Sequence, residues 1–247
     1  MKQMGNTVIN VDAWMAELLP QLQQSFGERL RYVGLQGSYR RGEATENSDI
    51  DVVVLLNTVT LDDLDTYRAI VRALPEGQKA CGFFSSAGDL FNWPRHELFA
   101  FQKDTADYWG KLEDFMPALS VNDAAESARI GASGLLHILT HSYLYAAEDE
   151  RPMILQQAYK AAFFVMLVQH CVATGVYCST KSQLLSRLEG ADKEIISAGL
   201  DVSLWPDSRA QREAYAALLH WCSTILQTAS NYHDAEQGSY ATTDHCC

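Results

Sequence analysis

The sequence predicts an α+β protein, in which a mixed sheet flanked by helices is followed by an all-helical bundle. Residues 49–56 (DIDVVVLL) are β-branched and almost wholly apolar, which is typical of an interior strand covered on both faces. After about residue 120, the apolar residues recur at helical spacing instead. A chain of 247 residues is long enough for two small domains. We expect them over residues 1–118 and 119–233, with a disordered tail over 234–247.

The first predicted element is a helix over residues 11–30. Its apolar residues Trp14, Leu18, Leu22 and Phe26 recur every four positions and would share one face. A short apolar strand over 31–35 follows and ends in a Gly-Ser turn before the strand over 49–56.

A helix is predicted from Thr60 to about Leu74. Thr60 is a good N-cap residue, and Asp62 and Asp63 supply negative charge to the first turn. Further strands are predicted over 80–85 and 97–103. The second half is predicted to be helical over residues 122–147, 153–175, 180–198 and 207–232.

The charge balance excludes some classes of protein. The chain has 31 acidic and 19 basic side chains and a formal net charge of −12, so duplex nucleic acid is not expected as its main partner. The N-terminus lacks the apolar region of a signal peptide, and the most apolar stretch, residues 161–168, is too short to span a bilayer. We therefore expect a cytoplasmic protein with no membrane partner, whose scattered cysteines are mainly reduced thiols.

Residues 37–54 (GSYRRGEATENSDIDVVV) carry the clearest chemical signal. Asp49 and Asp51 lie two positions apart on a predicted strand, so their side chains share one face and lie about 7 Å apart. Two carboxylates there are costly unless cations neutralise them, and Mg²⁺ ions, two of them expected, suit oxygen ligands and phosphate. Upstream, Gly37 and Ser38 offer backbone N–H groups and a hydroxyl to phosphate, and the basic pair beginning at Arg40 adds positive charge.

This segment resembles the signature of the nucleotidyltransferase superfamily. The pattern G-S-x3-G-x5-S-D-x-D is matched by Gly37, Ser38, Gly42, Ser48, Asp49 and Asp51. The superfamily includes DNA polymerase β and the aminoglycoside nucleotidyltransferases, and the chain resembles the two-domain bacterial members of the latter type. A competing interpretation, a Gly-Ser turn before an exposed acidic edge strand, is disfavoured because residues 52–56 are too apolar.

The resemblance implies a third carboxylate on the strand that follows the helix. Glu97 is our choice, as a metal ligand with Asp49 and Asp51 and as a catalytic residue; Asp104 and Asp89 are the alternatives. It also implies that Gly37, Ser38, Arg41 and Ser48 contact the nucleotide.

The helical half contains further candidate binding residues. In bacterial relatives such a domain holds part of the nucleotide and provides the acceptor site, so Lys160 and Lys181 are phosphate candidates. The alternative for Lys160 is a side chain that reaches solvent from the edge of the core. His137 and His141 are expected to be a packed or substrate-facing pair rather than a metal site.

The resemblance implies an enzyme of the nucleotidyltransferase class. It would move a nucleoside monophosphate from an NTP, with ATP expected, to a hydroxyl of a small molecule. An aminoglycoside-like antibiotic is one acceptor that the −12 charge favours, which would make this an antibiotic-resistance enzyme. The alternatives are a protein or tRNA acceptor, as in toxin–antitoxin systems, and a non-catalytic nucleotide-binding regulator. A monomer and a homodimer both remain open.

Overall fold

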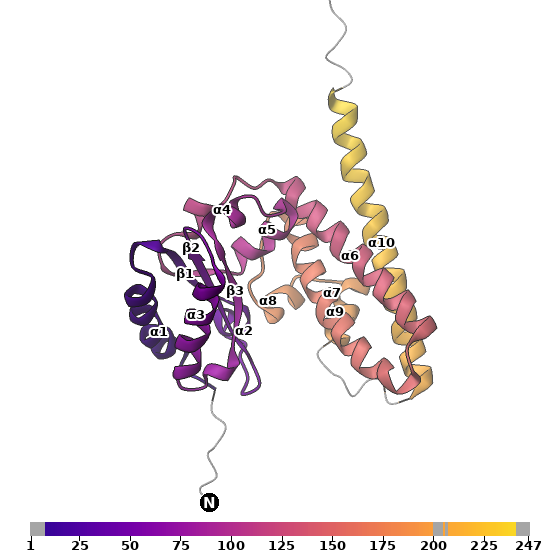
Figure 1. The fold of residues 1–247 in the computed structure, drawn as a ribbon. Helices are drawn as coiled ribbons and strands as arrows, with labels where there is room; N and C mark the ends of the chain where they lie inside the picture. Colours follow the sequence, from indigo (N-terminus) through magenta and orange to yellow (C-terminus); the bar gives the residue numbers. More distant parts are fainter. Residues whose placement is uncertain (1–7, 200–204, 206, 241–247) are drawn as a thin grey trace, which may run out of the picture. The chain divides into compact units, whose positions relative to one another are not determined.

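The computed structural model describes residues 8–199, 205 and 207–240 (Figure 1). The chain divides into two compact units between Leu119 and Ser120, and each is described here by itself. The first unit contains all the strands among the described residues, and the second is helical. The predicted α+β class is therefore confirmed.

The first unit is built on a mixed sheet with the strand order β3-β2-β1-β4. Strand β2 pairs parallel with β3 and antiparallel with β1, while β4 pairs antiparallel with β1. The strands are β1 (Leu30–Gln36), β2 (Ile50–Leu56), β3 (Ala80–Ser86) and β4 (Ala106–Trp109).

Short and long helices connect these strands. They are α1 (Val11–Phe26), α2 (Gly37–Arg41), α3 (Leu61–Ala73), α4 (Ala87–Phe91) and α5 (Arg95–Lys103), with 3-10 turns η1 (Gly27–Arg29), η2 (Gly77–Lys79) and η3 (Leu112–Phe115).

Both faces of the sheet are covered, as the apolar β2 sequence requires. On one face, α1 buries the predicted stripe from Trp14 to Phe26 against β1 and β2, and α3 adds Ile70 and Val71. On the other face, Tyr32, Val53 and Leu55 pack with a smaller cluster from α4, α5 and η3. The β2 strand is thereby buried along its length except near Asp51, so the polar end of this strand marks the accessible edge.

The expected strand over residues 97–103 is wrong, because this segment forms helix α5. Pro94 precedes the helix, Glu97 lies in its first turn and Lys103 in its last, which suits the helix dipole. The apolar run from Leu98 to Phe101 resembles a strand only when these helix-end signals are ignored. The strand that pairs beside β1 is instead β4, only four residues long.

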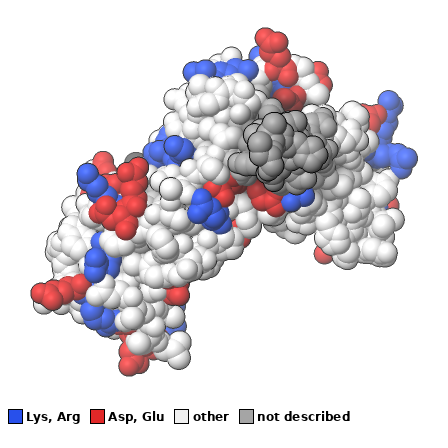
Figure 2. Space-filling model, turned by 90° about the horizontal axis from the view of Figure 1, so that it is seen from above, with Lys and Arg blue, Asp and Glu red and all other residues white. Residues whose placement is uncertain are grey.

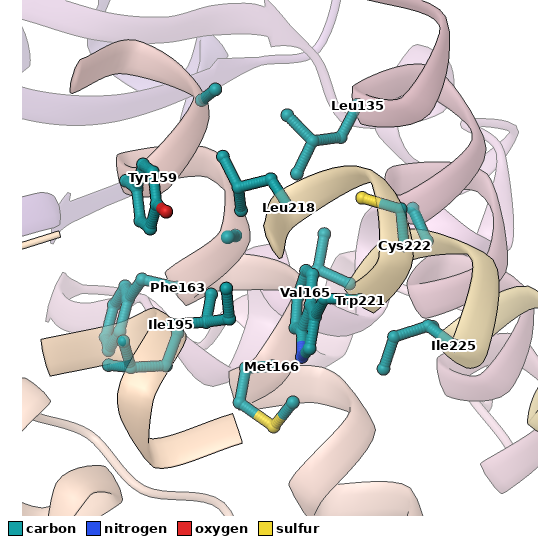
Figure 3. Packing of buried hydrophobic residues seen from close by; sticks show 14 of the residues in the cluster. Leu135, Tyr159, Phe163, Val165, Met166, Ile195, Leu218, Trp221, Cys222 and Ile225 are labelled. Carbon is teal, nitrogen blue, oxygen red and sulfur yellow. The ribbon is translucent and has the colours of Figure 1, made fainter. Parts of the chain in front are cut away.

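The second unit packs long helices around an apolar core. Figure 3 shows Phe163 and Met166 of α7, Ile195 of α9, and Leu218 and Trp221 of α10 in this core. Its helices are α6 (Val121–Tyr145), α7 (Arg151–Thr174), α8 (Lys181–Leu185), α9 (Gly190–Ala198) and α10 (Ser208–Tyr240), with the 3-10 turn η4 (Glu148–Glu150).

Two boundaries in this unit differ from those expected. The helix predicted over 180–198 is split into α8 and α9, and Glu189 is the N-cap of the second piece. Helix α10 extends to Tyr240 and so includes residues 234–240, for which the sequence predicts a disordered tail. No proline interrupts that stretch, so the helical repeat can continue. Residues 241–247, including the His-Cys-Cys end, lie outside the described residues.

Two further observations concern the described cysteines and helices. Cys81, Cys171, Cys178 and Cys222 are free thiols, and only Cys81 among them is exposed. Within the described ranges, every helix is too short or too polar to cross a membrane.

An ion pair joins the start of α3 to the turn η1, which leads into β1. Arg29 donates to both oxygens of Asp63, at 2.9 and 2.6 Å. Asp63 also accepts from the backbone N–H and hydroxyl of Thr60, so the predicted N-cap residue takes part in a capping box. Hydrogen bonds from Arg29 are the main reason that the pKa of Asp63 is lowered to about 2.

The lowered pKa of Asp63 predicts how stability depends on pH. The charged carboxylate contributes stability above its unfolded pKa of about 4, and this contribution is lost as the pH falls towards 2. Asp63→Asn should therefore lower the melting temperature by about 4 °C near pH 7. Thermal unfolding at pH values from 7 down to 2 should show the difference in melting temperature between wild type and variant shrinking. A difference that stays constant would contradict the stabilising role of the Asp63 charge.

Candidate active site

The Gly-Ser segment forms a tight turn of helix between β1 and the loop that leads to β2. Gly37 begins α2 with φ +72°, and Gly42 ends it with φ +71°, both in the left-handed region that favours glycine. A Cβ at Gly37 would lie 1.9 Å from the Asp51 Oδ2 atom, whereas one at Gly42 would meet nothing within 4 Å. The two signature glycines therefore differ: Gly37 is required by contact as well as by conformation.

The signature carboxylates lie at the start of β2. Asp51 is half-buried and stands opposite Gln36 of β1 and Cys81 of β3 in the sheet register. Asp49 is exposed and directly precedes the strand. Two accessible carboxylates beside a close-packed glycine backbone provide the oxygen donors that Mg²⁺ prefers.

The segment chosen to carry the third carboxylate is a helix rather than the expected strand. Strand β3, which follows helix α3, carries no acidic residue at all. Glu97 lies on α5 with an exposed side chain that accepts a 2.6 Å hydrogen bond from the Trp93 indole. Within the described part of the chain, no three His, Cys, Asp or Glu side chains are grouped so that they could hold a metal ion. The strand that motivated the choice of Glu97 is therefore a helix, and the role of Glu97 stays a prediction.

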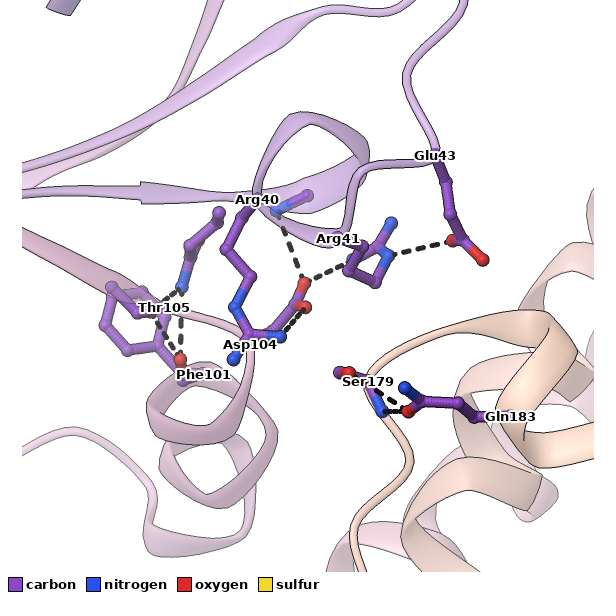
Figure 4. A network of polar contacts seen from close by, with 10 residues as sticks. Arg40, Arg41, Glu43, Phe101, Asp104, Thr105, Ser179 and Gln183 are labelled. Carbon is purple, nitrogen blue, oxygen red and sulfur yellow. Dashed lines mark hydrogen bonds and ion pairs between the residues drawn. The ribbon is translucent and has the colours of Figure 1, made fainter. Parts of the chain in front are cut away.

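The two alternative acids have other partners. Asp89 accepts a hydrogen bond from Ser86 and closes the N-terminal cap of α4. Asp104 lies next to the Gly-Ser segment: its Oδ2 accepts from Arg41 at 2.5 Å and from the Gly37 N–H at 3.3 Å (Figure 4). Asp104 is therefore the acidic residue that the structure brings to the signature.

The signature serines have different surroundings. Ser38 is half-buried in the first turn of α2, and its backbone carbonyl accepts from the Glu43 N–H at 2.8 Å. The Ser48 hydroxyl accepts from the Thr45 N–H at 2.9 Å, so it closes the loop that leads to Asp49. This loop role is a structural reason for serine at position 48, beside the nucleotide contact predicted for it.

The predicted lysines of the helical unit lie close together. Lys160 of α7 and Lys181, the first residue of α8, line one small pocket with Phe163. The Lys181 ammonium group lies 5.7 Å from the centre of the Phe163 ring. Two residues that are 21 positions apart in the sequence thus place positive charge at one site of this unit.

His137 and His141 line a separate cavity of about 510 Å³ between α6 and α7. Its other lining residues, including Ile138 and Ile154, are mostly apolar, and the two imidazole centres lie 6.1 Å apart. This placement agrees with a packed or ligand-facing pair.

The sequence did not predict the role of Asp107, the polar residue of β4. Asp107 accepts a 2.7 Å hydrogen bond from the Tyr32 hydroxyl and a longer one from the Leu112 N–H. Burial, and then this carboxylate, raise the pKa of Tyr32. The pair fixes the short β4 strand against the sheet, and with it the chain segment that carries Asp104. The four-residue strand has too weak a pattern to be found from sequence.

Comparisons with known proteins agree with this architecture. Residues 15–85 match the family model of the nucleotidyltransferase domain, which confirms the resemblance over that part of the chain. Among solved structures, the chain is similar to the spectinomycin adenyltransferase AAD(9) from Enterococcus faecialis, determined with ATP and spectinomycin. The TM-score is 0.52 at 12% identity, covering 87% of this chain and 99% of the other. No curated protein was found to match the chain. The likeness to AAD(9) shows a shared fold.

The Gly37–Asp51 contact predicts unequal effects of alanine at the two signature glycines. Gly42→Ala should lower the free energy of unfolding by about 1–2 kcal/mol, the usual penalty for alanine in the left-handed conformation. Gly37→Ala should cost roughly 2 kcal/mol more, because its Cβ also overlaps the carboxylate. Urea unfolding of both variants measures the difference.

Asp51→Ala provides the control for that difference. It removes the overlapping oxygen and leaves the Asp51 Cβ, which is 3.3 Å from the place that a Cβ at position 37 would take. In this background, Gly37→Ala should cost no more than Gly42→Ala; an undiminished excess would show that the contact is not its cause.

Cys81 offers a second probe of the site. It is the exposed thiol among the described cysteines and pairs with Asp51 on the neighbouring strand, about 5 Å away between backbones. MgATP should slow its alkylation by iodoacetamide several-fold, as followed by peptide mass spectrometry. Unchanged alkylation at saturating MgATP would place the nucleotide elsewhere.

Proposed function

We propose that this protein transfers the nucleoside monophosphate of an NTP, with ATP as the nucleotide, to a hydroxyl of a small molecule and releases pyrophosphate. The observation that carries the proposal is the close approach of Gly37 to Asp51 within the nucleotidyltransferase signature. This arrangement sets phosphate-binding backbone beside a carboxylate suited to a metal ion. The family match over residues 15–85 supports the same chemistry.

Asp49 and Asp51 are the residues that would hold Mg²⁺. The donor set fits this ion, because both side chains supply hard oxygen ligands and neither is sealed in the core. When bound, the ion supplies positive charge that neutralises phosphate oxygens. The rigid β2 strand fixes the position of Asp51, and the exposed position of Asp49 leaves its carboxylate accessible to solvent and ligand.

Phosphate binding is assigned to the Gly-Ser segment. The Gly37 N–H, the Ser38 hydroxyl and the Arg41 guanidinium are the donors in this segment, and oriented donors of this kind stabilise charge on a transferring phosphoryl group. Lys160 and Lys181 are included as further phosphate contacts, because they place two positive charges at one pocket of the helical unit.

A small-molecule hydroxyl is the favoured acceptor. The solved relative AAD(9) contains ATP and spectinomycin, and its fold spans both units of this chain. On the face drawn in Figure 2, Lys and Arg side chains are scattered among Asp and Glu, unlike the basic stripe that an RNA acceptor favours. The net charge of −12 also suits a cationic acceptor such as an aminoglycoside-like antibiotic.

A transfer assay tests the proposal directly. The protein is incubated with Mg²⁺, ATP labelled in the α-phosphate and a panel of aminoglycosides, spectinomycin included. We expect label on a small molecule together with pyrophosphate release, and Asp51→Asn should lower the rate by at least about 100-fold because it removes a metal ligand. Asp114→Asn, which makes the same change at an exposed acid of η3, should leave the rate unchanged.

Three outcomes of this assay test the role of Glu97, the class of acceptor and the enzymatic proposal itself. Glu97→Gln should retain the rate within about threefold if its carboxylate only holds Trp93; a loss as large as that of Asp51→Asn would restore it as a catalytic residue. Label on protein or tRNA would replace the small-molecule acceptor. Nucleotide binding without any pyrophosphate release would contradict the enzymatic proposal.

A further inference from the structure

Asp104 has an unusual position for a carboxylate. It is the C-cap residue of α5, where the helix dipole and the last backbone carbonyls disfavour negative charge. Its side chain is only 19% exposed, so water compensates it poorly. Cationic and N–H donors from the Gly-Ser segment therefore account for its place in the fold.

These donors come from one short stretch of chain. The Arg41 guanidinium donates to Asp104 Oδ2 at 2.5 Å, and the Gly37 N–H donates to the same oxygen at 3.3 Å. The Arg40 guanidinium lies 3.9 Å from Oδ1, as an ion pair without a hydrogen bond (Figure 4). One side-chain carboxylate thus collects two positive charges and the first N–H of the turn.

The Asp104 carboxylate does not use all of its capacity to accept hydrogen bonds. Its Oδ1 atom is buried and accepts no hydrogen bond, although a carboxylate oxygen can accept two. The Gly37 contact is also long for an N–H···O bond. Asp104 is consequently a weaker acceptor in this position than a phosphate group, which presents more oxygens and more charge to the same donors.

We propose that Asp104 is an internal counter-anion for the Gly-Ser segment, which holds the Gly37 N–H and the arginines until a nucleotide phosphate takes them over. This inference rests on the proposed function. A single N–H cannot serve two anions well, so phosphate binding at Gly37 requires Asp104 to release it. Asp104 competes with the nucleotide for these donors and is not a metal ligand.

The competition predicts a gain of affinity when the charge is removed. Asp104→Asn keeps the shape of the side chain but removes one negative charge beside the bound phosphate. It should tighten the binding of MgATP and of inorganic tripolyphosphate on the order of fivefold in isothermal titration at low salt, with a smaller gain at high salt. Damage to the fold would weaken binding, so a gain of affinity cannot be explained by misfolding.

Matched variants isolate the charge and its partner. Asp104→Glu keeps the charge and should show no gain, and Asp114→Asn removes an equivalent charge from an exposed site of the same unit and should also show none. In an Arg41→Gln background, the gain from Asp104→Asn should shrink, because the main shared donor is absent. If Asp104→Asn fails to fold by thermal melting, Asp104→Ser carries the same prediction.

The outcomes separate this inference from the proposed function. Unchanged or weaker binding of MgATP by a folded Asp104→Asn variant, with normal binding by the wild type, would overturn the counter-anion role alone. If that loss appears only with Mg²⁺ present and not with metal-free tripolyphosphate, Asp104 is a metal ligand instead. If the wild type and all variants bind neither MgATP nor tripolyphosphate, the proposed function fails as well.

Discussion

The contact between the Gly37 backbone and the Asp51 carboxylate is the constraint on which the candidate site depends. Glycine is favoured at position 37, because a Cβ there would overlap Asp51 Oδ2 in its present position and because the backbone is left-handed. Pairing of Gln36 with Asp51 brings the end of β1 beside the polar start of β2, so backbone N–H groups and a carboxylate share one edge of the sheet. Packing on both faces of β2 holds this edge rigid.

Charge complements that steric constraint. The acidic excess of the chain makes its few arginines important, and Arg41 lies between the carboxylates of Glu43 and Asp104. Its guanidinium is therefore fixed near Gly37 by acids of the same unit. An arginine ordered before any ligand binds lowers the entropic cost of binding an anion, although the competing charge of Asp104 offsets part of this gain.

The signature and the strands around it could be predicted from sequence because their signals are local. The apolar β2 run, the Thr60 cap and the spacing of Trp14 to Phe26 each depend on neighbouring residues. The segment after β3 could not, because its apolar residues suit a strand and only Pro94 and the charges at its ends indicate helix α5. Asp104 reaches Gly37 across 67 positions, and nothing in the local pattern encodes that contact.

On the function proposed here, metal and phosphate meet at the Gly37–Asp51 edge. Paramagnetic broadening by Mn²⁺ in the presence of ATP, read on the assigned backbone amide resonances, tests it without depending on the acceptor. We expect the amides of Gly37, Ser38 and the residues around Asp51 to broaden first and Asp51→Asn to abolish this effect. Broadening centred on another part of the chain, or unchanged in Asp51→Asn, would contradict it.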